Sequence, residues 1–173
     1  RRSSDLYTIL DTGSTDRTIE IAENVLKNKI GNIYKEPFVD FEISRNRLLS
    51  LAGHDCVFNL ILDDTYVVSG DYLRTVLTLF RGTDVNLVSL MINDNEYSYA
   101  SNRITRSKGD YRYKFKIHEI IDSRNDLIFC ISPDIATITD YVDDYMRTRS
   151  YDRKLFDLKL LKNSIETDPD NTP

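Results

Sequence analysis

The chain has 173 residues, a formal net charge of -5, 40% hydrophobic residues and 29% charged residues. This length suits one folded domain, and the composition excludes both a disordered chain and a membrane-spanning helix, because no apolar run approaches the ~20 residues that a bilayer requires. The acidic balance argues against non-specific binding to nucleic acid, but it permits a small anionic ligand held by a metal or an arginine.

The cysteines and the first residues bear on the compartment and on the chain's beginning. Cys56 and Cys130 lie far apart and match no metal or redox spacing, so we expect reduced thiols and a cytoplasmic location. The chain begins at Arg1 without a methionine. We therefore expect the complete protein to have further residues before it.

The first half alternates strand and helix patterns. Residues 6–10 form a predicted strand, and the turn after it opens a helix that Ser14 or Thr15 can cap. The apolar residues of this helix recur at helical spacing, at Ile19, Ala22, Leu26 and Ile30. The pattern then predicts a strand over 32–35, a helix over 43–52 and a strand over 56–62 that is buried on both faces.

The second half changes texture. A helix over 71–80, capped by Ser69, is expected to bury Leu73, Val76, Leu77 and Phe80, and a strand over 85–92 follows it. We expect residues 97–105 and 111–117 to form an antiparallel hairpin through 107–110, followed by short strands over 127–131 and 135–138. The last predicted helix, 151–165, carries an apolar set at Leu155, Leu158, Leu161 and Ile165.

Together these elements predict an α/β fold. The expected sheet is mixed but mainly parallel and flanked by helices, with an antiparallel hairpin in the second half. We assign residues 1–150 to one domain and residues 151–173 to a C-terminal helix and linker.

Two adjacent carboxylates, Asp63 and Asp64, follow the apolar strand over 56–62. Ligands of open α/β sheets bind beyond the carboxyl ends of the strands, so these acids can hold a metal that neutralises phosphates. The alternative is a turn with two solvated aspartates.

An ordered set of motifs resembles family 2 glycosyltransferases of the GT-A fold. The set is D-T-G-S-T-D-R-T after the first strand, R-N at 45–46, acids at the end of an apolar strand, and H-E at 118–119. It is most similar to the branch that carries H-E and often has tetratricopeptide-like helices behind the catalytic domain. D-P-D-N at 168–171 then looks like a linker into such helices.

The resemblance implies a nucleotide site that includes Asp11, Arg45 and Asp63, with Asn46 fixing a loop. The alternatives are a turn acid for Asp11 and a solvated helical residue for Arg45. The resemblance also places Mn²⁺ or Mg²⁺ on Asp63 and Asp64. Thr65 departs from the family's D-x-D pattern, since a second aspartate is expected there, but hard cations often need only one or two carboxylates.

The H-E motif implies the catalytic centre. Glu119 is the expected general base, and His118 either orients it, contacts diphosphate, binds metal or is structural. Arg103 and Arg106 are candidates for diphosphate or acceptor contacts, or else they are edge-strand charges that favour solubility.

The resemblance implies an inverting, metal-assisted glycosyltransferase. It would take a sugar from a nucleoside diphosphate sugar, and a uridine diphosphate (UDP) sugar is the favoured donor. The acceptor would be a hydroxyl of a glycan, protein or lipid-linked molecule, and we expect neither nucleic acid as a partner nor a membrane span in this segment. The alternative is a non-catalytic glycan- or nucleotide-binding module with a degenerate GT-A fold. Family members also have a strand before the one at 6–10, and we expect it to precede residue 1.

Overall fold

The computed structural model describes residues 5–94, 96–122, 126–141 and 144–167. The backbone divides into two compact units. The first unit takes the described residues within Arg1–Cys56, Arg112–Ile120 and Leu160–Pro173, and the second takes those within Val57–Tyr111 and Ile121–Lys159.

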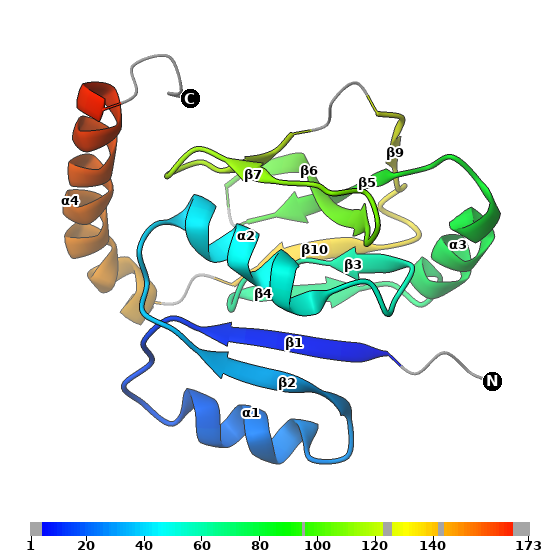
Figure 1. Ribbon diagram of the computed structural model, residues 1–173, viewed down its shortest axis with the longest axis horizontal. Helices are drawn as coiled ribbons and strands as arrows, with labels where there is room; N and C mark the ends of the chain where they lie inside the picture. Colours follow the sequence, from blue (N-terminus) through cyan, green and yellow to red (C-terminus); the bar gives the residue numbers. More distant parts are fainter. Residues whose placement is uncertain (1–4, 95, 123–125, 142–143, 168–173) are drawn as a thin grey trace. The chain divides into compact units, whose positions relative to one another are not determined.

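The first unit begins with the predicted strand, helix and strand. β1 (Leu6–Asp11) pairs in parallel with β2 (Ile30–Lys35), and α1 (Thr18–Leu26) connects them (Figure 1). A parallel pair needs such a crossover, because the chain must return to the starting end of the first strand. Three positions of the predicted apolar stripe, Ile19, Ala22 and Leu26, are half-buried as expected, whereas Ile30 begins β2 and is 60% exposed.

Aspartates lie at the starts of both α1 and the next helix, and in α1 an aspartate replaces the predicted serine or threonine. Ser14 and Thr15 do not cap α1; the Thr18 backbone N–H donates to Asp16 Oδ1 at 2.9 Å instead. The second helix, α2 (Phe41–Ala52), is capped by buried Asp40, whose Oδ1 accepts from the Ile43 N–H at 2.7 Å. A side-chain acceptor there satisfies a backbone donor that the helix leaves without an internal partner.

The second unit contains a curled six-stranded sheet with the order β3-β6-β5-β10-β4, and β9 also pairs with β5. Its strands are β3 (Phe58–Leu60), β4 (Tyr66–Ser69), β5 (Leu87–Asn93), β6 (Ser98–Arg106), β9 (Ile128–Cys130) and β10 (Thr137–Asp140). β5 runs parallel to β9 and β10, and the remaining pairings are antiparallel. The mixed α/β class is confirmed, but the expectation of a mainly parallel sheet is wrong for this unit.

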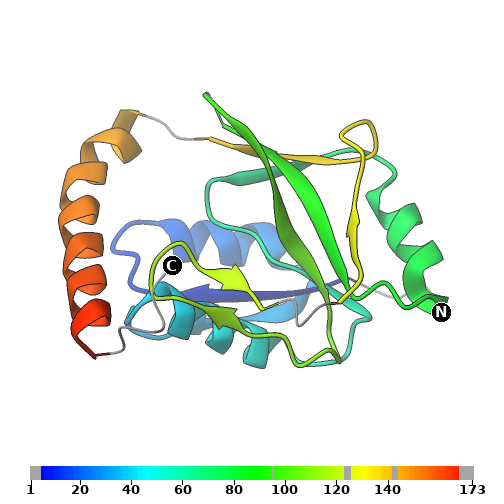
Figure 2. The same cartoon turned by 90° about the horizontal axis from the view of Figure 1, so that it is seen from above.

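The long β5–β6 hairpin explains this correction (Figure 2). Residues 94–97 alone connect the two strands, and so short a connection permits only antiparallel pairing. The predicted hairpin of 97–105 with 111–117 is therefore wrong, because β6 pairs with β5 and β3. Residues 113–114 instead form β7 (Tyr113–Lys114), which pairs with β8 (Ile120–Ile121).

The strand before the paired acids is not the buried strand that its apolar sequence predicts. β3 stands at one end of the strand order, and its last residue Leu60 and the flanking Val57 and Leu62 are 36–38% exposed. The central buried strand is β5, where Leu87, Val88, Leu90 and Ile92 are fully buried. An apolar run alone does not distinguish an edge strand from a central one, because strand order depends on pairings distant in sequence.

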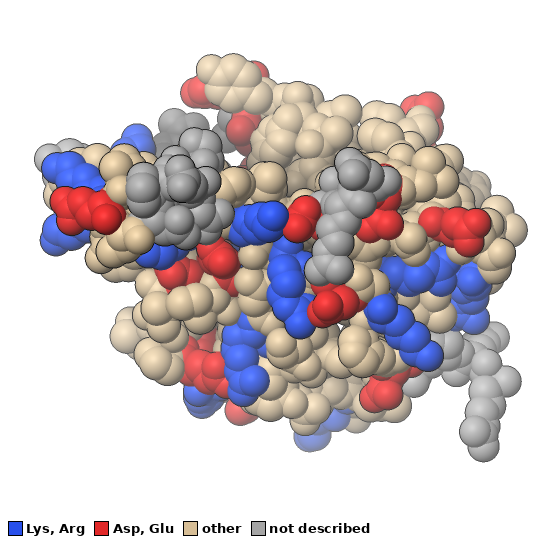
Figure 3. Space-filling model, turned by 45° about the horizontal axis from the view of Figure 1, so that its top comes forward, with Lys and Arg blue, Asp and Glu red and all other residues tan. Residues whose placement is uncertain are grey.

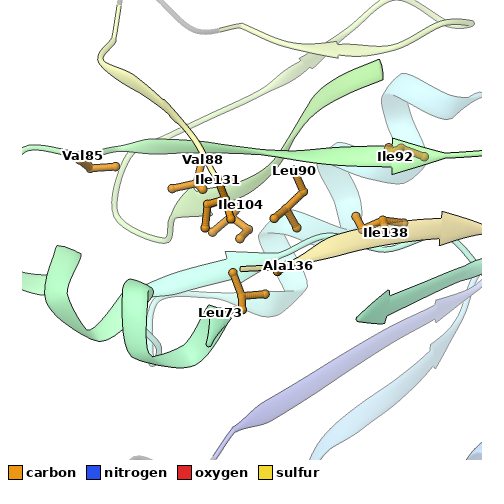
Figure 4. Close-up of a cluster of buried hydrophobic side chains, with 9 residues drawn as sticks. All are labelled: Leu73, Val85, Val88, Leu90, Ile92, Ile104, Ile131, Ala136 and Ile138. Carbon is orange, nitrogen blue, oxygen red and sulfur yellow. The ribbon is translucent and has the colours of Figure 1, made fainter. Parts of the chain in front are cut away.

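Figure 4 shows the core of the second unit, which consists of Leu73, Val85, Val88, Leu90, Ile92, Ile104, Ile131, Ala136 and Ile138. α3 (Leu73–Leu79) contributes the predicted face, since Leu73 is buried and Val76, Leu77 and Phe80 pack against this cluster. Ser69 does not cap α3. It belongs to β4, and a short 3-10 helix (Phe80–Gly82) follows α3.

α4 (Asp144–Thr167) contains the last predicted helix and begins earlier than expected. Its less exposed positions at the C-terminal end are Asp157, Leu160, Leu161 and Ser164, whereas Leu155, Leu158 and Ile165 are exposed. The predicted face is therefore wrong apart from Leu161, because the i, i+3, i+4, i+7 set that faces inward begins at Asp157.

Two further expectations concern the chain's C-terminal part and membranes. The domain boundary near residue 150 stays a prediction, and the expected linker at 168–171 lies outside the described residues. Within the described part of the chain, no helix is both long and apolar enough to cross a membrane.

Candidate functional site

The first unit brings the R-N and H-E motifs together. Arg45, on α2, lies with its Nε 3.0 Å from Glu119 Oε1, although the two residues are 74 positions apart in sequence. Their side chains are 14% and 13% exposed, respectively. Little water screens a pair at this depth, so the attraction between its two charges is stronger than in a surface pair.

Asn46 provides a second connection to the same segment. Its Nδ2 donates to the Tyr113 carbonyl at 2.9 Å, and the Tyr113 N–H donates to its Oδ1 at 2.8 Å. The side-chain amide thus imitates a neighbouring strand for β7. The expectation that Asn46 fixes a loop agrees with these two hydrogen bonds.

The segment that carries H-E has an unusual backbone. Phe115 and His118 have φ angles of 76° and 54°, in the left-handed region that side chains larger than glycine disfavour. The Phe41 N–H donates to the Lys116 carbonyl at 3.3 Å between them. Such conformations cost about 1–3 kcal/mol each and persist only where surrounding contacts enforce them, which is common at functional sites.

Asp11 ends β1 and closes the turn that follows. The Ser14 N–H lies 3.3 Å from both of its carboxylate oxygens, and its carbonyl accepts from the Glu36 N–H at 3.0 Å. These hydrogen bonds agree with the alternative that Asp11 is a turn acid. A role for Asp11 in nucleotide binding stays a prediction.

The second unit contains a polar group around Arg103. Arg103 Nη1 lies 3.6 Å from Asp63 Oδ2, Nη2 donates to the Tyr66 hydroxyl at 3.1 Å, and the guanidinium lies 4.9 Å from the centre of the Tyr66 ring. Arg103 occupies a bulge, because Val88 pairs with Ile104 while Ser89 pairs with Asn102. A bulge redirects the side chain of its extra residue, which here is the arginine.

Burial raises the pKa of Tyr66 well above its usual value, and a hydrogen bond with Tyr99 acts in the same direction, whereas the Arg103 charge opposes the shift. Tyr66 is therefore a neutral phenol at physiological pH. Tyr66 thus supplies a hydroxyl rather than a charge to this polar group.

Metal binding by Asp63 and Asp64 would depend on ligands from the substrate. Asp64 is exposed, and Asp63 faces Arg103. Among the described residues, no group of three or more His, Cys, Asp or Glu side chains is arranged to hold a metal ion. Two carboxylates still fit a hard cation when phosphate oxygens and water complete its coordination.

Arg106 makes structural contacts. Its guanidinium donates to the carbonyls of Phe80, Thr83 and Val85 at 2.8, 2.7 and 3.2 Å, and it lies 4.9 Å from the centre of the Phe58 ring. These carbonyls belong to the 3-10 helix and the turn that follow α3, so Arg106 holds this connection to β6. We therefore leave Arg106 out of the proposed site.

The motifs did not point to Asp140. This residue ends β10, directly opposite Tyr66 in the β10–β4 register. Its Oδ1 is buried and has no hydrogen-bond partner among the described residues. Asp140 belongs to no recognisable motif, and only the strand register brings it beside Tyr66.

No protein-family model matches the chain, and a search of curated proteins finds no significant match either. The function is therefore argued from the residues and their geometry.

Proposed function

We propose that the chain is the catalytic part of an inverting glycosyltransferase with a GT-A-like fold. It would transfer a sugar from a nucleoside diphosphate sugar, with a UDP-sugar favoured, to a hydroxyl of a glycan, protein or lipid-linked acceptor. Both basic and acidic side chains are visible on the face drawn in Figure 3, and the net charge of -5 favours a small-molecule donor over nucleic acid.

The contact between Arg45 and Glu119 is the observation that carries this proposal. The two motifs that the resemblance assigns to one catalytic site lie far apart in sequence, yet they meet through a mostly buried ion pair at 3.0 Å. Asn46 holds the same segment at Tyr113. A purely solvated role for Arg45 does not require such a contact.

In the proposed reaction Glu119 acts as the general base. The acceptor oxygen attacks the anomeric carbon from the face opposite the diphosphate, the bond between that carbon and the diphosphate oxygen breaks, and the acceptor proton passes to Glu119. Since Glu119 Oε1 faces Arg45, we assign proton transfer to Oε2. Arg45 then positions the base, in addition to the nucleotide contact expected from the sequence.

Asp63 and Asp64 are the proposed ligands for Mn²⁺ or Mg²⁺. When bound, the metal would stabilise the negative charge that develops on the departing diphosphate. Asp63 also forms an ion pair with Arg103, so this arginine provides a positive charge next to the proposed metal ligands.

The alternative, a non-catalytic glycan- or nucleotide-binding module, is favoured by two observations. Arg103 partly neutralises Asp63, and Thr65 replaces the carboxylate that would complete a D-x-D motif. A domain in which arginine has taken over the role of the metal can retain binding without turnover.

The test is to incubate the full-length protein with Mn²⁺ and a panel of UDP-sugars, and to measure both donor binding and released UDP. We expect Glu119→Gln to reduce turnover by about a hundredfold or more and to retain donor binding. Glu36→Gln is the matched control, because Glu36 pairs with Arg47 at an exposed position of the same unit. Donor binding by the wild type without turnover would select the non-catalytic module. Failure to bind any donor would reject both the transferase and a nucleotide-binding module.

The metal assignment is tested separately by Asp63→Asn and Asp64→Asn. We expect donor affinity to fall in both variants and to lose its dependence on Mn²⁺. Equal affinity with and without Mn²⁺ in the wild type would reject the metal while leaving Glu119 as the base.

A further inference from the structure

In the second unit, two residues next to Tyr66 each have a buried polar atom without a partner in the described part of the chain. These atoms are Arg103 Nε, a donor, and Asp140 Oδ1, an acceptor, and neither has a hydrogen-bond partner among the described residues. Buried polar groups are almost always hydrogen-bonded, so each exception requires an explanation such as a ligand or a water molecule.

The strand register fixes the face on which Asp140 lies, and two contacts bring Arg103 to the same tyrosine. Asp140 pairs with Tyr66, and two residues earlier Ile138 pairs with Val68. Residues directly opposite each other in antiparallel strands project on the same face, about 5 Å apart at Cβ, so the Asp140 side chain lies beside Tyr66 on the face that buries Ile138. Arg103 reaches Tyr66 from β6 through its hydroxyl and its ring.

The chemistry of these atoms selects the kind of ligand. A cation would satisfy Asp140 but not the arginine N–H, and an anion would satisfy Arg103 but be repelled by Asp140. A hydroxyl can accept from Arg103 and donate to Asp140 at once. A pair of neighbouring hydroxyls, together with the Tyr66 phenol, satisfies both atoms without adding charge.

We propose that Asp140 and Arg103 form a subsite that binds neighbouring hydroxyls of a sugar ring. The choice of a sugar rests on the proposed glycosyltransferase function, whereas the subsite rests on the two unpartnered atoms. The hydroxyls can come from the donor sugar, from the ribose of the nucleotide or from an acceptor sugar. Asp140 keeps some exposed surface as a residue, although its Oδ1 is buried.

The experiment measures the affinity of the full-length protein for UDP-glucose, UDP-N-acetylglucosamine, UDP and methyl glucoside by titration calorimetry. We expect Asp140→Ala to weaken at least one of these ligands by about tenfold to a hundredfold, the range for a hydrogen bond to a charged group. Loss confined to UDP-sugars identifies the donor sugar, equal loss for UDP identifies ribose, and loss for methyl glucoside identifies the acceptor. Asp84→Asn is the matched control, because Asp84 is exposed in the same unit.

A thermal melt separates a binding role from a structural one. Removing an acceptor that has no partner should leave the melting temperature of Asp140→Ala and Asp140→Asn unchanged or raised. A lowered melting temperature in both variants would mean that an ordered water makes Asp140 a structural residue, and it would overturn the subsite. Unchanged affinities in Asp140→Ala, with wild-type binding intact, would overturn the subsite alone. If the wild type binds none of the four ligands, the proposed function and the subsite both fail.

Discussion

Removing Arg45 should destabilise the first unit far more than removing its neighbour Arg47. Both arginines lie on α2 and pair with a glutamate. The side chains of Arg45 and Glu119 are 14% and 13% exposed, whereas those of Arg47 and Glu36 are 48% and 35% exposed. The two pairs therefore differ mainly in burial.

The magnitude follows from what remains after each substitution. Arg45→Ala leaves the Glu119 carboxylate mostly buried without its cation, and breaking a buried pair in this way costs about 3 kcal/mol at the low end of its range. For a chain of this length, that loss corresponds to about 6 to 12 °C in melting temperature. Arg47→Ala leaves Glu36 in contact with water, and we expect no comparable change.

The assay is urea denaturation followed by circular dichroism, applied to Arg45→Ala, Glu119→Gln and the double variant, with the matching Arg47 and Glu36 series. A strongly coupled pair gives a double variant that is less destabilised than the sum of the single variants. If Arg45→Ala and Arg47→Ala lose equal stability, or if the first cycle shows no coupling, the ion pair does not hold the H-E segment.

Two further predictions test the same framework. Asn46→Ala should cost about 2 kcal/mol, because two hydrogen bonds to Tyr113 are lost, and hydrogen exchange at the Tyr113 amide should accelerate; unchanged protection there would contradict the role of Asn46. Gly70→Ala should cost about 3 kcal/mol in a denaturation experiment, since Gly70 has φ +121° and an added Cβ would lie 2.2 Å from the Ile135 carbonyl oxygen. Gly82→Ala is the control, with no atom within 4 Å of the added Cβ, and similar losses in the two variants would refute the steric reasoning.

Local patterns predicted the separate elements well. The strand, helix and strand that become β1, α1 and β2 appear where turn residues and helical spacing place them. The buried face of α3 also agrees with its periodicity, because that face depends on positions within one helix. The predicted buried face of α4 is wrong. The leucines of α4 are distributed around its circumference, and only packing selects which of them are buried.

These local patterns did not predict which strands pair with each other. The apolar run before Asp63 resembles a central strand, yet β3 is the edge strand of its sheet and β5 is a central strand. Which strand lies next to which depends on connections distant in sequence, and hydrophobicity records only that a segment is partly buried.

The sequence by itself determined the α/β class, most of the helices and strands, and the candidate site residues: the paired acids, R-N and H-E. Only the tertiary structure decided that Arg45 meets Glu119, that a bulge directs Arg103 toward Asp63 and Tyr66, and that Asp140 ends its strand opposite Tyr66. The physical reason is that a side chain's chemistry is local, whereas its partner is chosen by strand register and helix packing between residues far apart in the chain.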